Sequence, residues 1–285
     1  MDFAWLEIDK TNSEVGSTAA PAQKPVDSAS HHRVAADLRR AGFLRSSTEY
    51  YAQAVGLDDR NFNAWMEYID TLVRARQLKE ADRLSAQILD SYRKVRVLYA
   101  SRALVLAHRG ALAEALSHSE VSLSDDEPHP YPKCVRAELL LRSDPGSRRH
   151  REDAGVLFDA AALASGGAWD VYFVGGCALM DARWSAHAAG YFAEAIHREP
   201  RGTVAWLCMG DCFHDMRLYD QALFYYEQAM RMEPTLTATV GRRLRATKFR
   251  YGLMRIFNRK TLQQRWEERY NIQSDKNWEP TTNDF

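Results

Sequence analysis

Residues 203–236 read TVAWLCMGDCFHDMRLYDQALFYYEQAMRMEPTL, and the spacing of their apolar residues decides the fold. Trp206, Gly210 and Phe213 recur at the period of a helix, so they share one face of a first helix. Ala222 and Tyr226 share a face of a second helix, which ends before the proline of MEPTL. Because glycine and alanine are small, the two backbones can approach closely while the aromatic rings fill the space beside them. The stretch therefore predicts two packed helices joined by a turn.

A set of residues in this stretch carries a family resemblance: Trp206, Met209, Gly210, Phe213, Ala222, Tyr226 and Pro234. The set resembles the tetratricopeptide repeat, with Met, Phe and Tyr standing where the family has Leu, Tyr and Phe. The resemblance implies an all-α fold, a solenoid in which stacked antiparallel helix pairs form a right-handed superhelix. It also implies that the protein holds other proteins, without naming the partner.

The same pattern recurs along the chain at the family's repeat length of about 34 residues. Most residues in the column of Gly210 are small, and those in the column of Tyr226 are aromatic or serine. The first column reads Ala35, Ile69, Ala103, Ala137, Gly176 and Gly210, and the second reads Tyr51, Ser85, Ser119, Phe158, Phe192 and Tyr226. The agreement predicts six units, at 28–61, 62–95, 96–129, 130–168, 169–202 and 203–236. The fourth unit contains extra residues within 142–153, where Asp144, Pro145 and Gly146 predict a turn before a basic, solvated helix start.

Both ends of the chain lie outside this pattern. Residues 1–27 are rich in Ser, Thr, Ala and Pro after a short acidic and aromatic start, and predict a disordered segment. Residues 237–273 predict a basic C-terminal capping helix, because the last unit of a solenoid needs its apolar face covered. Residues 274–285 predict a disordered tail. The basic patch of the capping region comprises Arg242, Arg243, Arg245, Lys248 and Arg250.

The composition excludes some classes of function. The 38 Lys and Arg residues balance 38 Asp and Glu residues, so the net charge gives no argument for nucleic acid or membrane binding. No apolar run reaches the roughly 20 residues of a membrane-spanning helix, and the N-terminus lacks the pattern of a secretory signal. The cysteines fall inside helical patterns, which is typical of reduced thiols. These features predict a cytoplasmic protein without a membrane span.

The sequence contains no motif that indicates catalysis. A Gly-rich phosphate loop, a nucleophile elbow and an HExxH motif are all absent, so we expect no enzymatic activity and no cofactor. Cys208 and Cys212 lie one turn apart, with His214 or Cys177 as further candidates for a metal ligand. A structural zinc site needs about four ligands, and the spacing places only two, so we predict no metal site.

In this family the first helix of each unit lines the concave surface, and the resemblance implies that fixed positions on it contact the ligand. Carried over by register, these positions predict a peptide-binding groove that contains Met66, Asp70, Leu104, Glu138, Phe173, Val174, Cys177, Leu207 and Asp211. The family's clamp for a terminal carboxylate is missing, because His32 and Ala36 stand where it opens with Lys and Asn, and Asp70 would repel a carboxylate. Binding of an Hsp70 or Hsp90 C-terminus is therefore disfavoured.

Acidic and apolar residues of the fifth and sixth units favour a different ligand, an apolar helix or extended segment that carries a few positive charges. The chain's own basic C-terminal segment has that composition, and we expect it to fold near this end of the groove. The sequence thus predicts a scaffold or adaptor that binds a partner peptide or helix. A chaperone-like role is a more specific version of this prediction. The alternative is binding of nucleic acid or another anionic surface through the basic C-terminal helix. The two differ in their response to salt, since phosphate binding weakens steeply as ionic strength rises.

Overall fold

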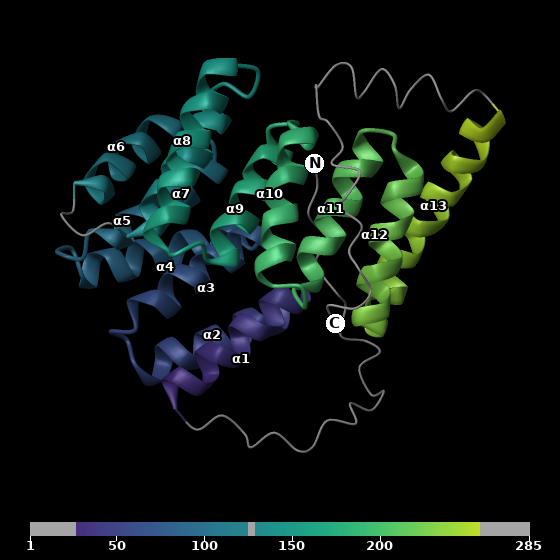
Figure 1. Cartoon of the computed structure of the whole chain (residues 1–285). Coiled ribbons are helices and arrows are strands. Elements are labelled where there is room, and N and C mark those ends of the chain that lie inside the picture. Colours follow the sequence, from purple (N-terminus) through teal and green to yellow (C-terminus); the bar gives the residue numbers. More distant parts are fainter. Residues whose placement is uncertain (1–26, 125–128, 257–285) are drawn as a thin grey trace.

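The computed structural model describes residues 27–124 and 129–256, which form α-helices joined by short turns (Figure 1). The predicted N-terminal segment up to residue 26, the part of the capping region after residue 256 and the tail at 274–285 lie outside the described residues. The helices are α1 (Ser28–Ala41), α2 (Leu44–Leu57), α3 (Phe62–Arg74), α4 (Leu78–Ser91), α5 (Val97–His108), α6 (Leu112–Leu123), α7 (Pro130–Ser143), α8 (Arg148–Ala164), α9 (Trp169–Asp181), α10 (Ser185–Arg198), α11 (Thr203–Asp215), α12 (Tyr219–Met232), the 3₁₀ turn η3 (Pro234–Leu236) and α13 (Thr237–Ile256).

Consecutive helices pack as pairs, and each pair stacks on the next. The pairs begin at Ser28, Phe62, Val97, Pro130, Trp169 and Thr203, at or one residue after the starts that the repeat spacing gives. α13 packs against α12 at the end of the array (Figure 1). This arrangement is the tetratricopeptide fold, so the prediction of an α-helical solenoid of stacked pairs is confirmed.

The fifth and sixth pairs are each held together by a glycine that faces an aromatic ring. A Cβ atom built on Gly210 would lie 2.6 Å from the ring of Tyr226, and one built on Gly176 would lie 2.6 Å from the ring of Phe192. Both rings are completely or almost completely buried. The aromatic ring therefore occupies the space that a larger residue in the first helix would need, which is the packing predicted from the two columns.

The aromatic residue at the fourth position of a unit makes a recurring hydrogen bond. The indole Nε1 of Trp206 donates to the carbonyl of Pro200 at 2.9 Å, and that of Trp65 donates to the carbonyl of Asp59 at 3.0 Å. An aromatic ring with a polar edge can pack in the core and still satisfy a turn carbonyl. The side chain thus fastens the start of each of these units to the loop that precedes it.

The extra residues of the fourth unit contact the unit that follows. Trp184 lies in the turn between α9 and α10, and its Nε1 donates to the carbonyl of Pro145 at 2.8 Å. The guanidinium of Arg151 lies 4.3 Å from the centre of the Trp184 ring. Arg148 and Arg149 point into solvent, so the basic cluster is divided between a packing contact and a solvated helix start.

The turn between the two helices has a left-handed backbone position in five of the six pairs, all except the fourth. This position holds Gly42 and Gly110 in the first and third units, but Arg76, Arg183 and Arg217 in the second, fifth and sixth units, all with positive φ. A residue with a Cβ atom is strained in this conformation by about 1–2 kcal/mol, whereas glycine adopts it freely. The repeat therefore carries backbone strain in three of its turns.

Replacing Arg217 with glycine should raise the free energy of unfolding by about 0.5–1 kcal/mol, after the greater entropy of unfolded glycine is allowed for. Urea unfolding followed by circular dichroism measures the change. The reverse substitution Gly110→Arg is the matched control, because nothing lies within 4 Å of its Cβ position and only the backbone is strained. It should lower stability by a similar amount; equal stability of both variants would show that these turns are not strained.

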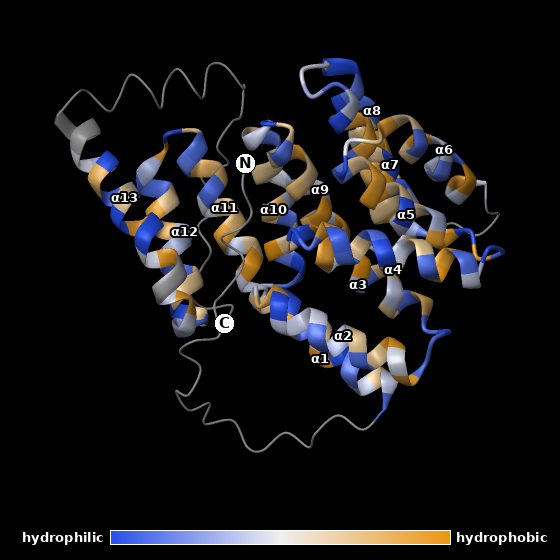
Figure 2. Ribbon diagram, turned by 180° about the vertical axis from the view of Figure 1, so that it is seen from behind, coloured by the Kyte–Doolittle hydropathy of each residue, from blue (hydrophilic) through white to orange (hydrophobic). Residues whose placement is uncertain are grey.

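The apolar core has two parts that meet on α7. Val135 and Leu139 of this helix pack with the first three units, while Ala137 and Leu141 pack with the last three. Figure 2 shows hydrophobic and hydrophilic residues alternating along the helices. The core therefore passes through the array from one end to the other, and α7 joins its halves.

The first unit also packs against the far end of the array. Residues of α1 contact residues of α11, and Leu44 belongs to the core cluster of units four to six. The guanidinium of Arg40 lies 5.8 Å from the centre of the Trp169 ring. Figures 1 and 2 both show α1 ending beside α9 and α11. The solenoid is therefore closed across its inner side, a contact that the repeat pattern did not predict.

Candidate ligand site

The residues that the repeat register placed on the groove are buried in this structure. These are Met66, Asp70, Leu104, Glu138, Phe173, Val174, Cys177, Leu207 and Asp211, and none is more than 9% exposed. The register correctly identifies them as residues of the first helices of their units, but it contains no information on contact between the first and last units. In this conformation, a partner can reach this face only where the packing leaves a cavity.

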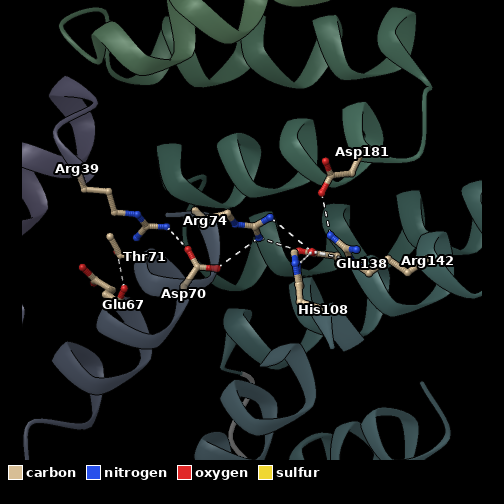
Figure 3. A network of polar contacts seen from close by, with 9 residues as sticks. All are labelled: Arg39, Glu67, Asp70, Thr71, Arg74, His108, Glu138, Arg142 and Asp181. Carbon is tan, nitrogen blue, oxygen red and sulfur yellow. Dashed lines mark hydrogen bonds and ion pairs between the residues drawn. The ribbon is translucent and has the colours of Figure 1, made fainter. Parts of the chain in front are cut away.

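A chain of buried charges crosses the inner face from α1 to α9 (Figure 3). Asp70 accepts hydrogen bonds from Arg39 at 2.6 Å and from Arg74 at 3.3 Å. Arg74 donates onward to Glu138 at 2.7 Å. Arg142, on α7, donates from Nε to Glu138 at 3.1 Å. A further bond, from Arg142 to Asp181 at 2.8 Å, carries the chain to α9.

Glu138 is the centre of this network, because it contacts three basic side chains. Besides Arg74 and Arg142, it faces Nε2 of His108 at 2.7 Å. Burial by itself would raise the pKa of Glu138, but the charge of Arg74 and the hydrogen bond from His108 hold it well below its usual range. An ionised carboxylate only accepts hydrogen bonds, so His108 carries its proton on Nε2. Burial lowers the pKa of His108, which favours the neutral ring.

A cavity of about 220 Å³ opens beside the Asp70 end of this network. It lies among α1, α3, α7 and α9, which come from the first, second, fourth and fifth units. Its lining residues are Arg39, Asn63, Met66, Glu67, Asp70, His129, Pro130, Tyr131, Cys134, Ser165, Ala168, Asp170, Val171 and Val174. Asn63 is exposed at its edge. The cavity is thus a small hollow on the inner face, open to solvent beside Asn63.

Three of the predicted groove residues, Met66, Asp70 and Val174, line the cavity. The predicted positions Leu104, Phe173, Cys177 and Leu207 lie in the apolar core instead. The sequence-based list did not contain residues at helix starts and unit boundaries, such as Asn63 and His129, although Asp170 was among the acidic residues expected at the groove of the fifth and sixth units. The repeat register identifies ligand-contacting positions only in the middle of each first helix. It therefore gives no indication of residues at the helix starts or between units.

The carboxylates of the cavity differ in how they are neutralised. Asp70 is bound by two guanidinium groups, whereas Glu67 accepts from the hydroxyl of Tyr51 at 2.7 Å and faces Nε2 of His32 at 3.2 Å. Burial would raise the pKa of Glu67, but the hydrogen bond from His32 and the charge of Arg39 hold it below its usual range. Asp170 accepts a hydrogen bond from the backbone N–H of Val171 and forms no ion pair within the described ranges. Burial raises the pKa of Asp170 despite the opposing charge of Arg39.

Asp211 belongs to a separate cluster at the C-terminal end of the array. Its carboxylate accepts a hydrogen bond from the hydroxyl of Tyr226 at 2.6 Å and pairs with Arg243 of α13. Burial raises the pKa of Asp211, and the charge of Arg243 opposes this shift. The first part of the C-terminal segment thus reaches the last unit, while the part after residue 256 lies outside the described residues.

The basic patch of α13 is partly engaged in the packing of this helix. Arg243 pairs with Asp211, Lys248 lies 3.4 Å from Glu227, and Arg250 lies 3.2 Å from Nε2 of His214. The side chains of Arg242, Arg245, Lys248 and Arg250 are exposed. The contacts to α11 and α12 fit a helix that covers the last unit.

The cysteines are buried core residues. Cys134, Cys177, Cys208 and Cys212 have free thiols, and Cys212 lies against the sulfur of Met180 at 3.7 Å. Burial raises the pKa of the Cys208 and Cys212 thiols well above the usual range, so the thiolate form that binds metals is disfavoured. No group of three His, Cys, Asp or Glu side chains is arranged to hold a metal ion within residues 27–124 and 129–256. Over the same ranges, no helix combines the length and the apolar character needed to cross a membrane.

No model of a known protein family matches the sequence, and no curated protein matches it. Among solved structures, the chain is similar to yeast Tom70, with 12% identity and a TM-score of 0.48 over 85% of this chain and 50% of that chain. It is similar to a chain of the APC/C hetero-tetramer Cut9–Hcn1, with 9% identity and a TM-score of 0.47 over 79% of this chain and 44% of that chain. It is also similar to YrrB, a TPR protein with an unusual peptide-binding site, with 14% identity and a TM-score of 0.40 over 69% of this chain and 98% of that chain.

The chain thus spans half or less of the length of the Tom70 and Cut9–Hcn1 chains. At such identities and TM-scores, neither function nor partner transfers to this protein. Its class comes from its own helices, which form six stacked pairs in the tetratricopeptide arrangement, followed by a helix packed on the sixth pair.

Proposed function

We propose that this protein is an interaction scaffold that binds a segment of a partner protein at the cavity on the inner face of the solenoid. One observation carries the proposal: a cavity of about 220 Å³ opens on the inner face, and Asp170 on its wall has no ion-pair partner among the described residues. Stacked helices hold the lining residues in place before a ligand arrives, which reduces the ordering cost of binding. Four units contribute residues to the cavity, so it exists only in the assembled array.

Two features limit the site to a short segment. The cavity volume of about 220 Å³ lies below the roughly 300–1,000 Å³ of pockets that enclose drug-sized ligands. The rest of the predicted groove is buried, so a longer ligand would need the first unit to separate from α9 and α11. A partner is therefore expected to insert a side chain and to rest the remainder of its segment on the rim.

The alternative site, the basic face of α13, has less support. Arg243, Lys248 and Arg250 already contact groups on α11 and α12, which reduces the charge available to an anionic partner. Binding of nucleic acid by this helix would also show a steep dependence on salt. A cavity ligand held largely by apolar contacts would show a weaker one.

The substitution Asn63→Trp should weaken partner binding, because it places a large ring on the exposed edge of the cavity without disturbing the core. The measurement begins with selection of random 16-residue peptides on the full-length chain. Affinities of the selected peptides for the wild type and the variant are then compared by fluorescence anisotropy. We expect a loss of about tenfold or more, equivalent to about 1.4 kcal/mol.

The matched control is Ala86→Trp, which adds the same ring to an exposed position of α4, a helix that contributes nothing to the cavity. This variant should bind like the wild type. Peptides that bind the Asn63→Trp variant unchanged would place the binding surface elsewhere. Failure to select any peptide would contradict the proposed function itself.

A further inference from the structure

Building on the proposed function, we infer that the cavity receives a lysine or arginine side chain of the partner segment. The chemical class of the ligand is thus a peptide that presents a basic residue, and the aliphatic stem of that residue would lie against the cavity walls. Three properties of the site lead to this assignment: its charge, its apolar surface and the arrangement of its one lining guanidinium.

The charge of the lining is negative. Glu67, Asp70 and Asp170 oppose the guanidinium of Arg39. That guanidinium is already bound to Asp70 at 2.6 Å, and Asp70 is bound by Arg74 as well. The carboxylates of Glu67 and Asp170 are thus left facing the cavity without a guanidinium or ammonium partner among the described residues. A cation placed between them would supply the missing charge in a partly desolvated site, where such contacts are strong.

The walls of the cavity suit the stem of a basic side chain. They are formed by Met66, Pro130, Val171 and Val174, together with the ring of Tyr131. Lysine and arginine combine an apolar stem with a charged head, so they can bury the stem on such walls and direct the head to a carboxylate. A purely apolar side chain would leave Asp170 without an ion-pair partner. An acidic side chain would add another negative charge beside Glu67 and Asp170.

Asp170 is the residue that best separates a binding role from a structural one. Its carboxylate lies in the first turn of α9, where the helix dipole favours negative charge, yet burial raises its pKa. The charged form is therefore held in an unfavourable environment by the fold. Sites used for binding often keep such a group at the expense of stability.

The substitution Asp170→Asn should weaken binding of basic peptides by about tenfold or more while leaving the fold at least as stable as the wild type at pH 7. If Asp170 had a purely structural role, the Asp170→Asn variant would be less stable than the wild type. The probes are the peptides selected on the full-length chain, each synthesised with its basic residue intact, replaced by citrulline and replaced by glutamate. Affinities are measured by anisotropy, and stabilities by urea unfolding.

Asp159→Asn is the control, since Asp159 is an exposed acid of α8 outside the cavity lining. On the wild type and on this control, citrulline should weaken binding about tenfold and glutamate should weaken it further. On the Asp170→Asn variant, the difference between arginine and citrulline should largely vanish. Selected peptides that lose binding on Asn63→Trp but are indifferent to citrulline would overturn this inference and leave the scaffold function standing. Absence of peptide binding altogether would overturn both.

Discussion

Replacing Glu138 with glutamine is expected to lower the free energy of unfolding by about 3–5 kcal/mol at pH 7, because it removes the buried negative charge that the guanidinium groups of Arg74 and Arg142 share. Asp70, at 3.3 Å, would remain as the charged partner of Arg74, and His108 would lose its charged acceptor. The shape of the side chain is unchanged, so the loss reports on charge rather than on packing. Urea unfolding of the full-length chain measures it.

The effect of this substitution should depend on pH in a defined direction. The pKa of Glu138 is lowered in the folded protein, so its contribution is present above the unfolded-state value of about 4.3 and is lost as the pH falls below it. The stability difference between the wild type and Glu138→Gln should therefore be largest near neutral pH and shrink on acidification. The exposed pair of Arg148 and Glu152 provides the control, since Glu152→Gln should change stability little at any pH. A difference that stayed constant down to pH 3 would show that the charge of Glu138 is not what stabilises the network.

Truncation of Phe192 to alanine should be equally damaging, with a loss of about 3–5 kcal/mol. The ring is completely buried and lies against both Gly176 and Phe173, so its removal leaves a cavity between α9 and α10. Phe249→Ala is the matched control. Its ring is 70% exposed on α13, and its removal should change stability by no more than about 0.5 kcal/mol.

The contact between Phe192 and Gly176 can be tested directly, because the two substitutions should not be additive. Gly176→Ala alone should destabilise the protein by about 1–3 kcal/mol, since its Cβ would lie 2.6 Å from the ring. In the Phe192→Ala background the same change should stabilise by up to about 1 kcal/mol, because the clash is gone and alanine favours the helix. Additive effects in this double-mutant cycle would mean that the two residues do not compete for the same space.

The helices and their pairing could be predicted from the sequence because they depend on contacts that are local in the chain. Gly210 and Tyr226 lie within one unit, and their spacing alone indicates that they meet. The left-handed turn was not recognised, since arginine occupies it in three units and only two units show glycine. The five added residues of the fourth unit were located, but not their contact with Trp184, which lies in the next unit.

The candidate site could be predicted only in part, because it depends on how units far apart in sequence come together. The register gave Met66, Asp70 and Val174 as inner-face residues. It could not show that Asp170 lies beside Glu67, since that requires the fifth unit to approach the second. Leu104, Phe173, Cys177 and Leu207, which the register placed on the groove, lie in the core.

The contact between α1 and α11 also bears on how this array could change in evolution. In an open solenoid each pair touches only its neighbours, so pairs can be gained or lost without altering the rest. Here the first pair packs against the fifth and sixth pairs. Arg40 contacts Trp169 only if the superhelical rotation and rise of the intervening pairs bring these two residues together. Adding or removing a pair would carry the two ends past each other and open the cavity between them. The contact between the first and last units therefore constrains the number of repeats in this chain.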